Sequence, residues 1–84
     1  MTRDDLTPAQ RDMLREEPML QLFFYGHLPP RLGLISKPFC DLAWTIAAQD
    51  GNTMSLPRNP ERSACLRKLR EAKDCAVTAA LWSA

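Results

Sequence analysis

The side chains of this sequence that suit ligand chemistry gather at the starts of two predicted helices. Aromatic rings stack on nucleobases, and guanidinium groups hold phosphates. A helix N-terminus adds backbone N–H groups that attract phosphate. If an oligomer brings the two helix starts together, they form a pocket for a small phosphorylated nucleotide. The candidate ligand-binding residues are Tyr25, His27, Arg31 and Lys37 at the first start, and Arg58, Arg62 and Ser63 at the second.

The sequence holds no group of residues that is typical of an enzyme. Nucleophilic catalysis needs a Ser or Cys activated by a positioned base, and His27 is the single histidine. The cysteines Cys40, Cys65 and Cys75 have neither CxxC nor Cys/His spacing for zinc. We therefore expect no catalytic residue, no metal and no cofactor, with Cys65 and Cys75 as reduced core thiols.

Length and charge narrow the class of protein. A chain of 84 residues forms one small domain, which is marginally stable unless it is stapled or oligomeric. The net charge of +1 argues against a protein that neutralises long stretches of duplex DNA. No run approaches the roughly 20 apolar residues of a membrane span. We expect a soluble cytoplasmic protein.

The elements that must position these side chains begin with a helix over residues 59–82. Asn59 is a suitable N-cap, and Pro60 suits the first helical position. The charged face of this helix has the i,i+4 spacing of a solvated, ion-paired surface. The expected packing stripe consists of small apolar residues that allow a close helix partner: Cys65, Leu69, Ala72, Ala76 and Ala79.

A first long helix is predicted from Pro29 or Pro30 to about Gln49, followed by turn residues 50–52. Pro38 should kink this helix or divide it, with Ser36 as a cap. Trp44 lies off the expected seam and is available for an edge or subunit contact. The seam has the spacing of a helix–helix contact: Ile35, Phe39, Leu42 and Ile46.

Residues 1–20 are predicted to be an N-terminal extension, either a short helix or an arm. Thr7 and Gln10 have capping-box spacing around Pro8. Residues 20–30 are predicted to form an ordered loop, because a short strand without a neighbour is unstable. Phe23 or Phe24 should anchor that loop in the core.

The predicted architecture is all-α: an antiparallel helical hairpin over residues 21–84, with the extension before it. Two helices share one seam and cannot enclose a core alone. Leu32, Trp44, Leu66 and Trp82 should then stay partly exposed, which on a small protein marks an interface. We therefore expect a homo-oligomer.

Three stretches, FFYGHLPP, PFCDLAWTIA and NPERSACLRKLREAKDCAVTAAL, resemble the phage anti-CBASS and Thoeris anti-defence hairpin family. The resemblance covers roughly residues 22–81. It implies a homo-oligomer, commonly a hexamer, that sequesters cyclic nucleotide immune signals without cleaving them. It matches Tyr25 and His27 to base contacts, and Arg62 and Ser63 to phosphate contacts. Gly26 between the tyrosine and the histidine departs from the family pattern, as does DCAVTAA late in the chain.

Three functions follow from these observations. The first is sequestration of cyclic di- or trinucleotides, or of cyclic ADP-ribose-type signals, in the cytoplasm of an infected bacterium. The second is a phage protein–protein interaction module that docks through Trp44 and Trp82. The third is a nucleic-acid-associated regulator that uses Arg58, Arg62 and further arginines, and it ranks last because nearby acidic residues cancel much of the charge.

Overall fold

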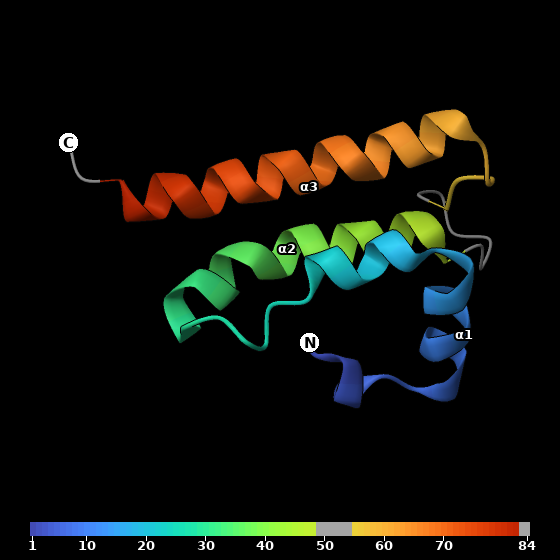
Figure 1. The fold of residues 1–84 in the computed structure, drawn as a ribbon, viewed down its shortest axis with the longest axis horizontal. Coiled ribbons are helices and arrows are strands. Elements are labelled where there is room, and N and C mark those ends of the chain that lie inside the picture. Colours follow the sequence, from blue (N-terminus) through green and yellow to red (C-terminus); the bar gives the residue numbers. More distant parts are fainter. Residues whose placement is uncertain (49–54, 83–84) are drawn as a thin grey trace.

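The computed structural model describes residues 1–48 and 55–82, and these residues form helices and no strand. The expected all-α class is thereby confirmed. Figure 1 shows the two long helices side by side and running in opposite directions. In chain order the elements are the 3-10 helix η1 (Arg3–Asp5), α1 (Pro8–Glu16), the 3-10 helix η2 (Pro18–Phe23), α2 (Pro30–Ala47) and α3 (Pro60–Leu81).

Helix α3 begins and ends where the sequence predicts. The Asn59 side chain accepts a hydrogen bond from the Arg62 backbone N–H at 2.8 Å, and Pro60 takes the first helical position. The expected packing stripe is correct only in part, because Cys65 and Leu69 pack against the core. Ala72 and Ala79 are exposed, whereas Arg62 and Leu66 are the buried residues of α3.

Helix α1 carries the predicted capping box. The Gln10 backbone N–H donates to the Thr7 hydroxyl at 3.2 Å, and the Thr7 N–H donates to the Gln10 side-chain oxygen at 2.9 Å. Thus two backbone N–H groups at the start of the helix are satisfied by local side chains. Residues 8–16 therefore form a defined helix in the N-terminal extension.

The ordered loop predicted over residues 20–30 is wrong in its first part, because residues 18–23 form η2. A 3-10 helix has three residues per turn, so Leu20 and Phe23 share one face. Both side chains are fully buried, and Phe23 is one of the two aromatic anchors that the sequence offered. Burial of this face explains why the segment is helical rather than extended.

Helix α2 is undivided through Pro38, with Ser36 inside it rather than at a cap. The predicted seam is correct in part: Ile46 is buried and Phe39 packs against the core, but Ile35 is half-buried and Leu42 is exposed. Small side chains instead form most of the buried face, which allows close approach of the elements packed on it. The buried residues are Gly33, Ser36, Cys40, Ala43, Trp44, Ile46 and Ala47. The turn predicted at residues 50–52 lies outside the described residues.

The core joins the extension to the helix pair. Leu6 and Leu20 from residues 1–20 belong to the same buried cluster as Cys40 and Leu66. Trp44 is also buried, and its ring stacks on Phe24 with the centroids 6.4 Å apart, so its predicted place on an exposed flank is wrong. Within the residues described, no helix is long and apolar enough to cross a membrane.

Candidate functional site

The two groups of predicted ligand residues lie at opposite ends of the α2–α3 pair. Residues 25–31 lead into α2 and form its first turn, whereas residues 58–63 form the start of α3. Because the two helices run in opposite directions, their starts are separated by the length of the pair (Figure 1). One chain therefore does not join them, and the pocket predicted from the sequence requires a second copy.

At the start of α2, His27 and Arg31 are exposed and Tyr25 is half-buried. The backbone N–H groups of Tyr25 and Gly26 both donate to the Met1 carbonyl, at 3.1 and 3.0 Å. These bonds tie the turn that carries His27 to the beginning of the chain. His27 is thus presented to solvent from a backbone that is fixed on one side.

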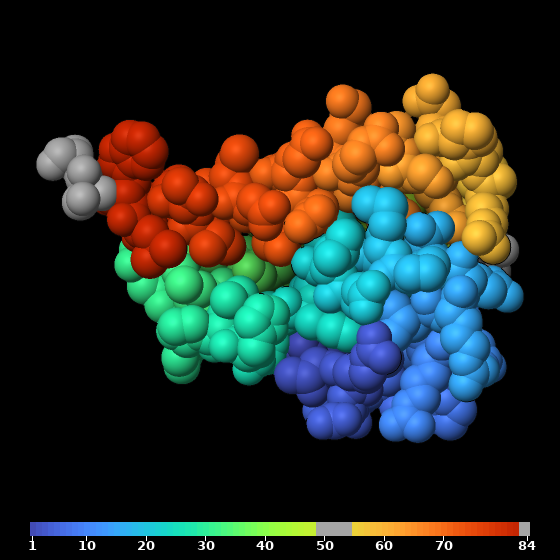
Figure 2. All heavy atoms as spheres, in the orientation of Figure 1, coloured from blue at the N-terminus to red at the C-terminus, as the bar shows by residue number. Residues whose placement is uncertain are grey.

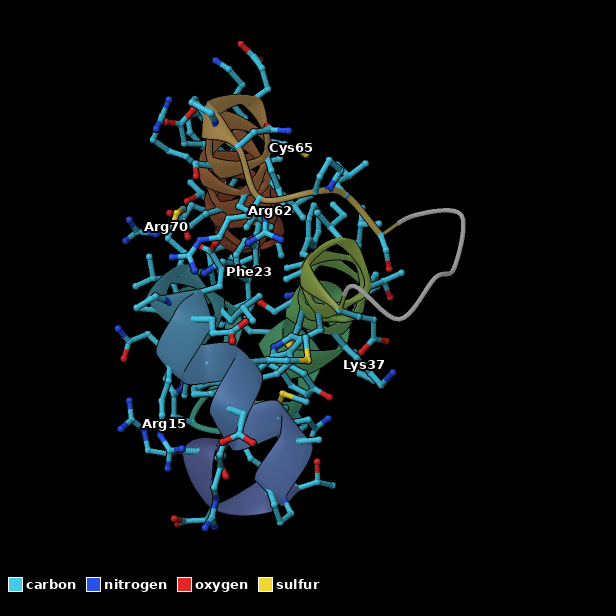
Figure 3. The ribbon with its side chains drawn as sticks, turned by 90° about the vertical axis from the view of Figure 1, so that its right-hand side faces the viewer. Arg15, Phe23, Lys37, Arg62, Cys65 and Arg70 are labelled. Atoms are coloured by element: carbon cyan, nitrogen blue, oxygen red, sulfur yellow. The ribbon has the colours of Figure 1, made fainter. Side chains whose placement is uncertain are left out.

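Lys37 lies on another side of the molecule. Its ammonium group is 2.6 Å from the Asp41 carboxylate, and this hydrogen bond raises the pKa of Lys37. Figure 3 shows Lys37 pointing away from the side on which Arg15 and Arg70 project. The structure therefore does not bring Lys37 together with those two arginines.

At the start of α3, Arg58 is exposed and Ser63 is half-buried, but Arg62 is inside the protein. The Arg62 side chain is 2% exposed, and its Nη2 donates to the Glu17 carboxylate at 2.9 Å. Its Nη1 donates to the Leu56 carbonyl at 3.2 Å. Figure 3 shows Arg62 pointing from α3 toward the N-terminal helices. In a single chain its guanidinium group is therefore engaged by protein oxygens.

One predicted residue, His27, lines a cleft of about 480 Å³ between residues 21–28 and α3, which we call the His27 cleft. On the face drawn in Figure 2, the cyan and teal segment of residues 20–28 lies against the middle of α3. Ligand sites typically measure about 300–1,000 Å³. The lining consists of Gln21, Leu22, Phe24, His27, Leu28, Ser36, Lys73, Asp74, Val77 and Thr78.

Two polar side chains of this cleft have unusual environments. Lys73 is 14% exposed, and its ammonium group donates to the Leu22 carbonyl at 3.0 Å and lies 3.1 Å from the Asp74 carboxylate. Ser36 is 1% exposed, and its hydroxyl has no hydrogen-bond partner among the residues described. A buried hydroxyl without a partner is unfavourable by about 1–3 kcal/mol. A ligand in the cleft that reached this hydroxyl would supply the missing hydrogen bond.

A second cleft, of about 520 Å³, lies between η1, α1 and η2, and we call it the arginine cleft. Three of its side chains are arginines and one is an aspartate, so its formal charge is positive. Gln21 lines this cleft as well as the His27 cleft. The lining consists of Arg3, Asp4, Leu6, Arg11, Leu14, Arg15, Pro18 and Gln21.

The C-terminal end of α3 carries a third, mostly apolar groove. Trp82 is 75% exposed, as predicted from the sequence, and Leu81 is 63% exposed. Leu66, which was expected to share this exposure, is fully buried. The groove measures about 570 Å³ and is lined by Asp74, Cys75, Thr78, Ala79 and Trp82.

The three cysteines occupy different environments. Cys40 is fully buried, and burial raises the pKa of its thiol to about 11. Cys65 is half-buried, and Cys75 is exposed, so the expectation of a core position is wrong for Cys75. A raised pKa leaves little thiolate near neutral pH, which makes Cys40 a weak nucleophile.

Sequence reasoning missed most residues of the two polar clefts. Ser36 and Lys73 gave no signal in the sequence beyond their places in helices, because only tertiary packing decides which residues of a helix line a cleft. Arg11 and Arg15 carried a usable signal, since a spacing of four places both on one face of α1. Arg3 adds to them only because η1 folds back beside α1.

Set against known proteins, the chain matches no protein-family model, no curated protein and no solved structure.

Proposed function

We propose that this chain is a non-enzymatic binding protein that sequesters a small phosphorylated nucleotide, with the His27 cleft as its site. The observation that carries the proposal is the combination in one cleft of apolar walls, the Lys73 ammonium group, the His27 ring and a buried hydroxyl without a partner among the described residues. Sequestration has no chemical step, so the ligand is released unchanged. The function then depends on affinity and on the amount of protein present.

The lining of the cleft suits the parts of a nucleotide. Phe24, Leu28 and Val77 supply an apolar surface for a flat base. His27 and Lys73 supply hydrogen-bond donors for acceptor atoms of the ligand. The resemblance of the sequence to phage anti-defence hairpins supports cyclic di- or trinucleotides, or cyclic ADP-ribose-type signals, as ligands in the cytoplasm of an infected bacterium.

The proposal includes homo-oligomerisation of the helical hairpin, with a hexamer as the state that the resemblance favours. The start of α2 lies at one end of the antiparallel pair and the start of α3 at the other (Figure 1); His27 and Arg31 belong to the first segment, and Arg58 and Ser63 to the second. Two copies packed in opposite directions would therefore place one end beside the other. Such packing would add the remaining predicted cations to a ligand held in the cleft.

The direct test is a thermal-shift screen of the purified protein against cyclic dinucleotides, cyclic trinucleotides and cyclic ADP-ribose. At a ligand concentration a hundredfold above Kd, binding stabilises the folded state by about 2.7 kcal/mol. For a domain of this size that corresponds to a shift of roughly 10–20 °C. Mass spectrometry after heat release should recover the ligand intact.

Two variants connect the shift to the cleft. His27→Ala removes a lining donor, and Lys73→Met removes a cation while keeping most of the side-chain volume. Both should reduce the shift, whereas Arg67→Ala, an exposed arginine outside the clefts, serves as the control. If no compound in the screen stabilises the protein at millimolar concentration, the proposed function is wrong for these signals.

The exposed apolar end of α3 favours a second candidate function, a protein–protein interaction module. Leu81 and Trp82 are exposed beside an apolar groove, and Leu34 of α2 is 73% exposed. Exposed apolar groups of this kind often mark an interface. If the protein is such a module, Trp82→Ser should abolish capture of its protein partner and leave nucleotide-induced stabilisation unchanged. A variant that still captures the same partner would exclude the module.

A further inference from the structure

The His27 cleft and the arginine cleft adjoin each other. Gln21 lines both of them, so this one side chain stands at their boundary. Its side-chain oxygen accepts a hydrogen bond from Arg3 at 3.0 Å, which ties the boundary to the arginine cleft. A ligand that crosses Gln21 would therefore contact both clefts without leaving the protein surface.

The two clefts differ in chemistry. The His27 cleft has apolar walls and the Ser36 hydroxyl, which has no hydrogen-bond partner in residues 1–48 and 55–82. The arginine cleft has three guanidinium groups, of which Arg15 is paired with Asp12 at 2.8 Å. Arg11 has no ion-pair partner within the part of the chain that the structure describes. An apolar half and a cationic half match the base and the phosphates of a nucleotide, respectively.

The surrounding charges support the same arrangement. Figure 3 shows Arg15 and Arg70 projecting on one side of the molecule, and this is the side drawn in Figure 2, where residues 20–28 meet α3. Each of these two arginines has a carboxylate partner, Asp12 for Arg15 at 2.8 Å and Asp74 for Arg70 at 3.9 Å, so neither is an unpaired cation. Arg11 and Arg3 are the cations of the arginine cleft without a carboxylate partner among the described residues.

We propose that the two clefts form one bipartite site for a nucleotide with at least two phosphates. The base lies in the His27 cleft with its polar edge at Ser36, and the phosphates cross Gln21 to Arg3 and Arg11. This inference rests on the proposed function, because it assigns the parts of the same ligand. It adds that the phosphates are recognised by residues of η1 and α1, within the first 20 residues of the chain.

The test compares adenosine, ADP and cyclic di-AMP as probes in equilibrium binding to the full chain. The Arg3→Ala/Arg11→Ala double variant should weaken the Kd for ADP and cyclic di-AMP at least tenfold and leave the Kd for adenosine unchanged. Ser36→Ala should weaken all three. The wild-type affinity for ADP should fall more steeply with added salt than that of the double variant.

The controls separate binding from folding. Arg67→Ala removes an exposed arginine outside both clefts and should leave every Kd unchanged. Because Arg3 and Arg11 are exposed, the double variant should retain the wild-type circular dichroism spectrum. Gln21→Ala, at the boundary between the clefts, should weaken ADP binding more than adenosine binding.

The possible results of these binding experiments test different parts of the proposed site. Unchanged ADP and cyclic di-AMP affinity in the arginine double variant would overturn the bipartite site and leave the proposed function standing. An equal loss of adenosine binding would overturn it too, because the arginines would then act on the base half or on the fold. If none of the nucleotide probes binds the wild-type protein, the bipartite site is wrong together with the use of the His27 cleft for these nucleotides.

Discussion

The ion pair between Arg62 and Glu17 gives the sharpest prediction about this fold. The Arg62 side chain is 2% exposed and that of Glu17 is 11% exposed, and their nitrogen and oxygen are 2.9 Å apart. Removing one member of a buried pair leaves the other charge buried without compensation, at a cost of about 3–5 kcal/mol. We therefore expect Arg62→Leu and Glu17→Leu each to lower the free energy of unfolding by about that amount.

The double variant, in contrast to the single variants, should keep the stability of the wild type. With both charges gone, no desolvation penalty is left, and buried ion pairs replaced by apolar residues are often neutral or more stable by about 1–4 kcal/mol. Glu17→Leu/Arg62→Leu should therefore unfold within about 1 kcal/mol of the wild type, or above it. The loss of the Arg62 hydrogen bond to the Leu56 carbonyl offsets part of any gain.

Urea unfolding followed by circular dichroism measures these differences. For a chain of 84 residues the whole stability is roughly 4–13 kcal/mol, so a single variant should lose a large part of it and melt at least about 12 °C lower. Arg58→Ala, an exposed arginine four residues away, is the matched control and should stay within about 0.5 kcal/mol. A cost below about 1 kcal/mol for Arg62→Leu would refute the buried pair. Arg62 would then be solvated and free for a phosphate.

Three further predictions concern the cap, the thiols and the N-terminal turn. Asn59→Ala should lower the stability to urea by about 1 kcal/mol, because the first turn of α3 loses its side-chain acceptor, and Asn59→Asp should restore it. Because burial raises the pKa of Cys40 from 9.0 to about 11, the unfolded thiol ionises first. The free energy of unfolding, measured by urea titration, should therefore not depend on the Cys40 thiol below pH 9 and should fall between pH 9 and 11. An alkylating reagent at pH 8 should modify Cys75 long before Cys40. Gly26→Ala would place a Cβ against the Thr2 methyl group, so it should destabilise the protein by about 1–3 kcal/mol. Thr2→Ser removes that methyl group and should restore the stability. Equal melting temperatures for Gly26→Ala with and without Thr2→Ser would contradict the clash.

Local structure in this chain could be predicted from the sequence because its causes are local. Asn59 followed by Pro60, and Thr7 spaced from Gln10, specify helix starts through hydrogen bonds that span three residues. The helix bounds and the all-α class follow from such signals. An anchor at Phe23 or Phe24 was also predicted, because a large apolar ring has few alternatives to burial, and Phe23 is the fully buried one.

The buried faces of the helices were decided by tertiary packing. Helix α2 has apolar residues around most of its circumference, so periodicity alone fits more than one seam. The small side chains of Ser36, Cys40 and Ala43 allow η2 and α3 to approach closely, and that contact outweighs the larger residues at Phe39 and Leu42. Trp44 is buried for the same reason, because η2 and the following turn bring Phe24 onto it.

Some residues of the candidate site could likewise be identified from the sequence, whereas others required the tertiary structure. The sequence alone marked His27 and Tyr25, because an aromatic residue and the single histidine precede a helix start. It also marked Arg62 for phosphate, but Glu17 lies 45 residues earlier in the chain, and only the folded chain brings their charges together. Local hydrogen bonds thus determine where helices begin, whereas cavities and buried charges arise from contacts between distant segments that no local pattern contains.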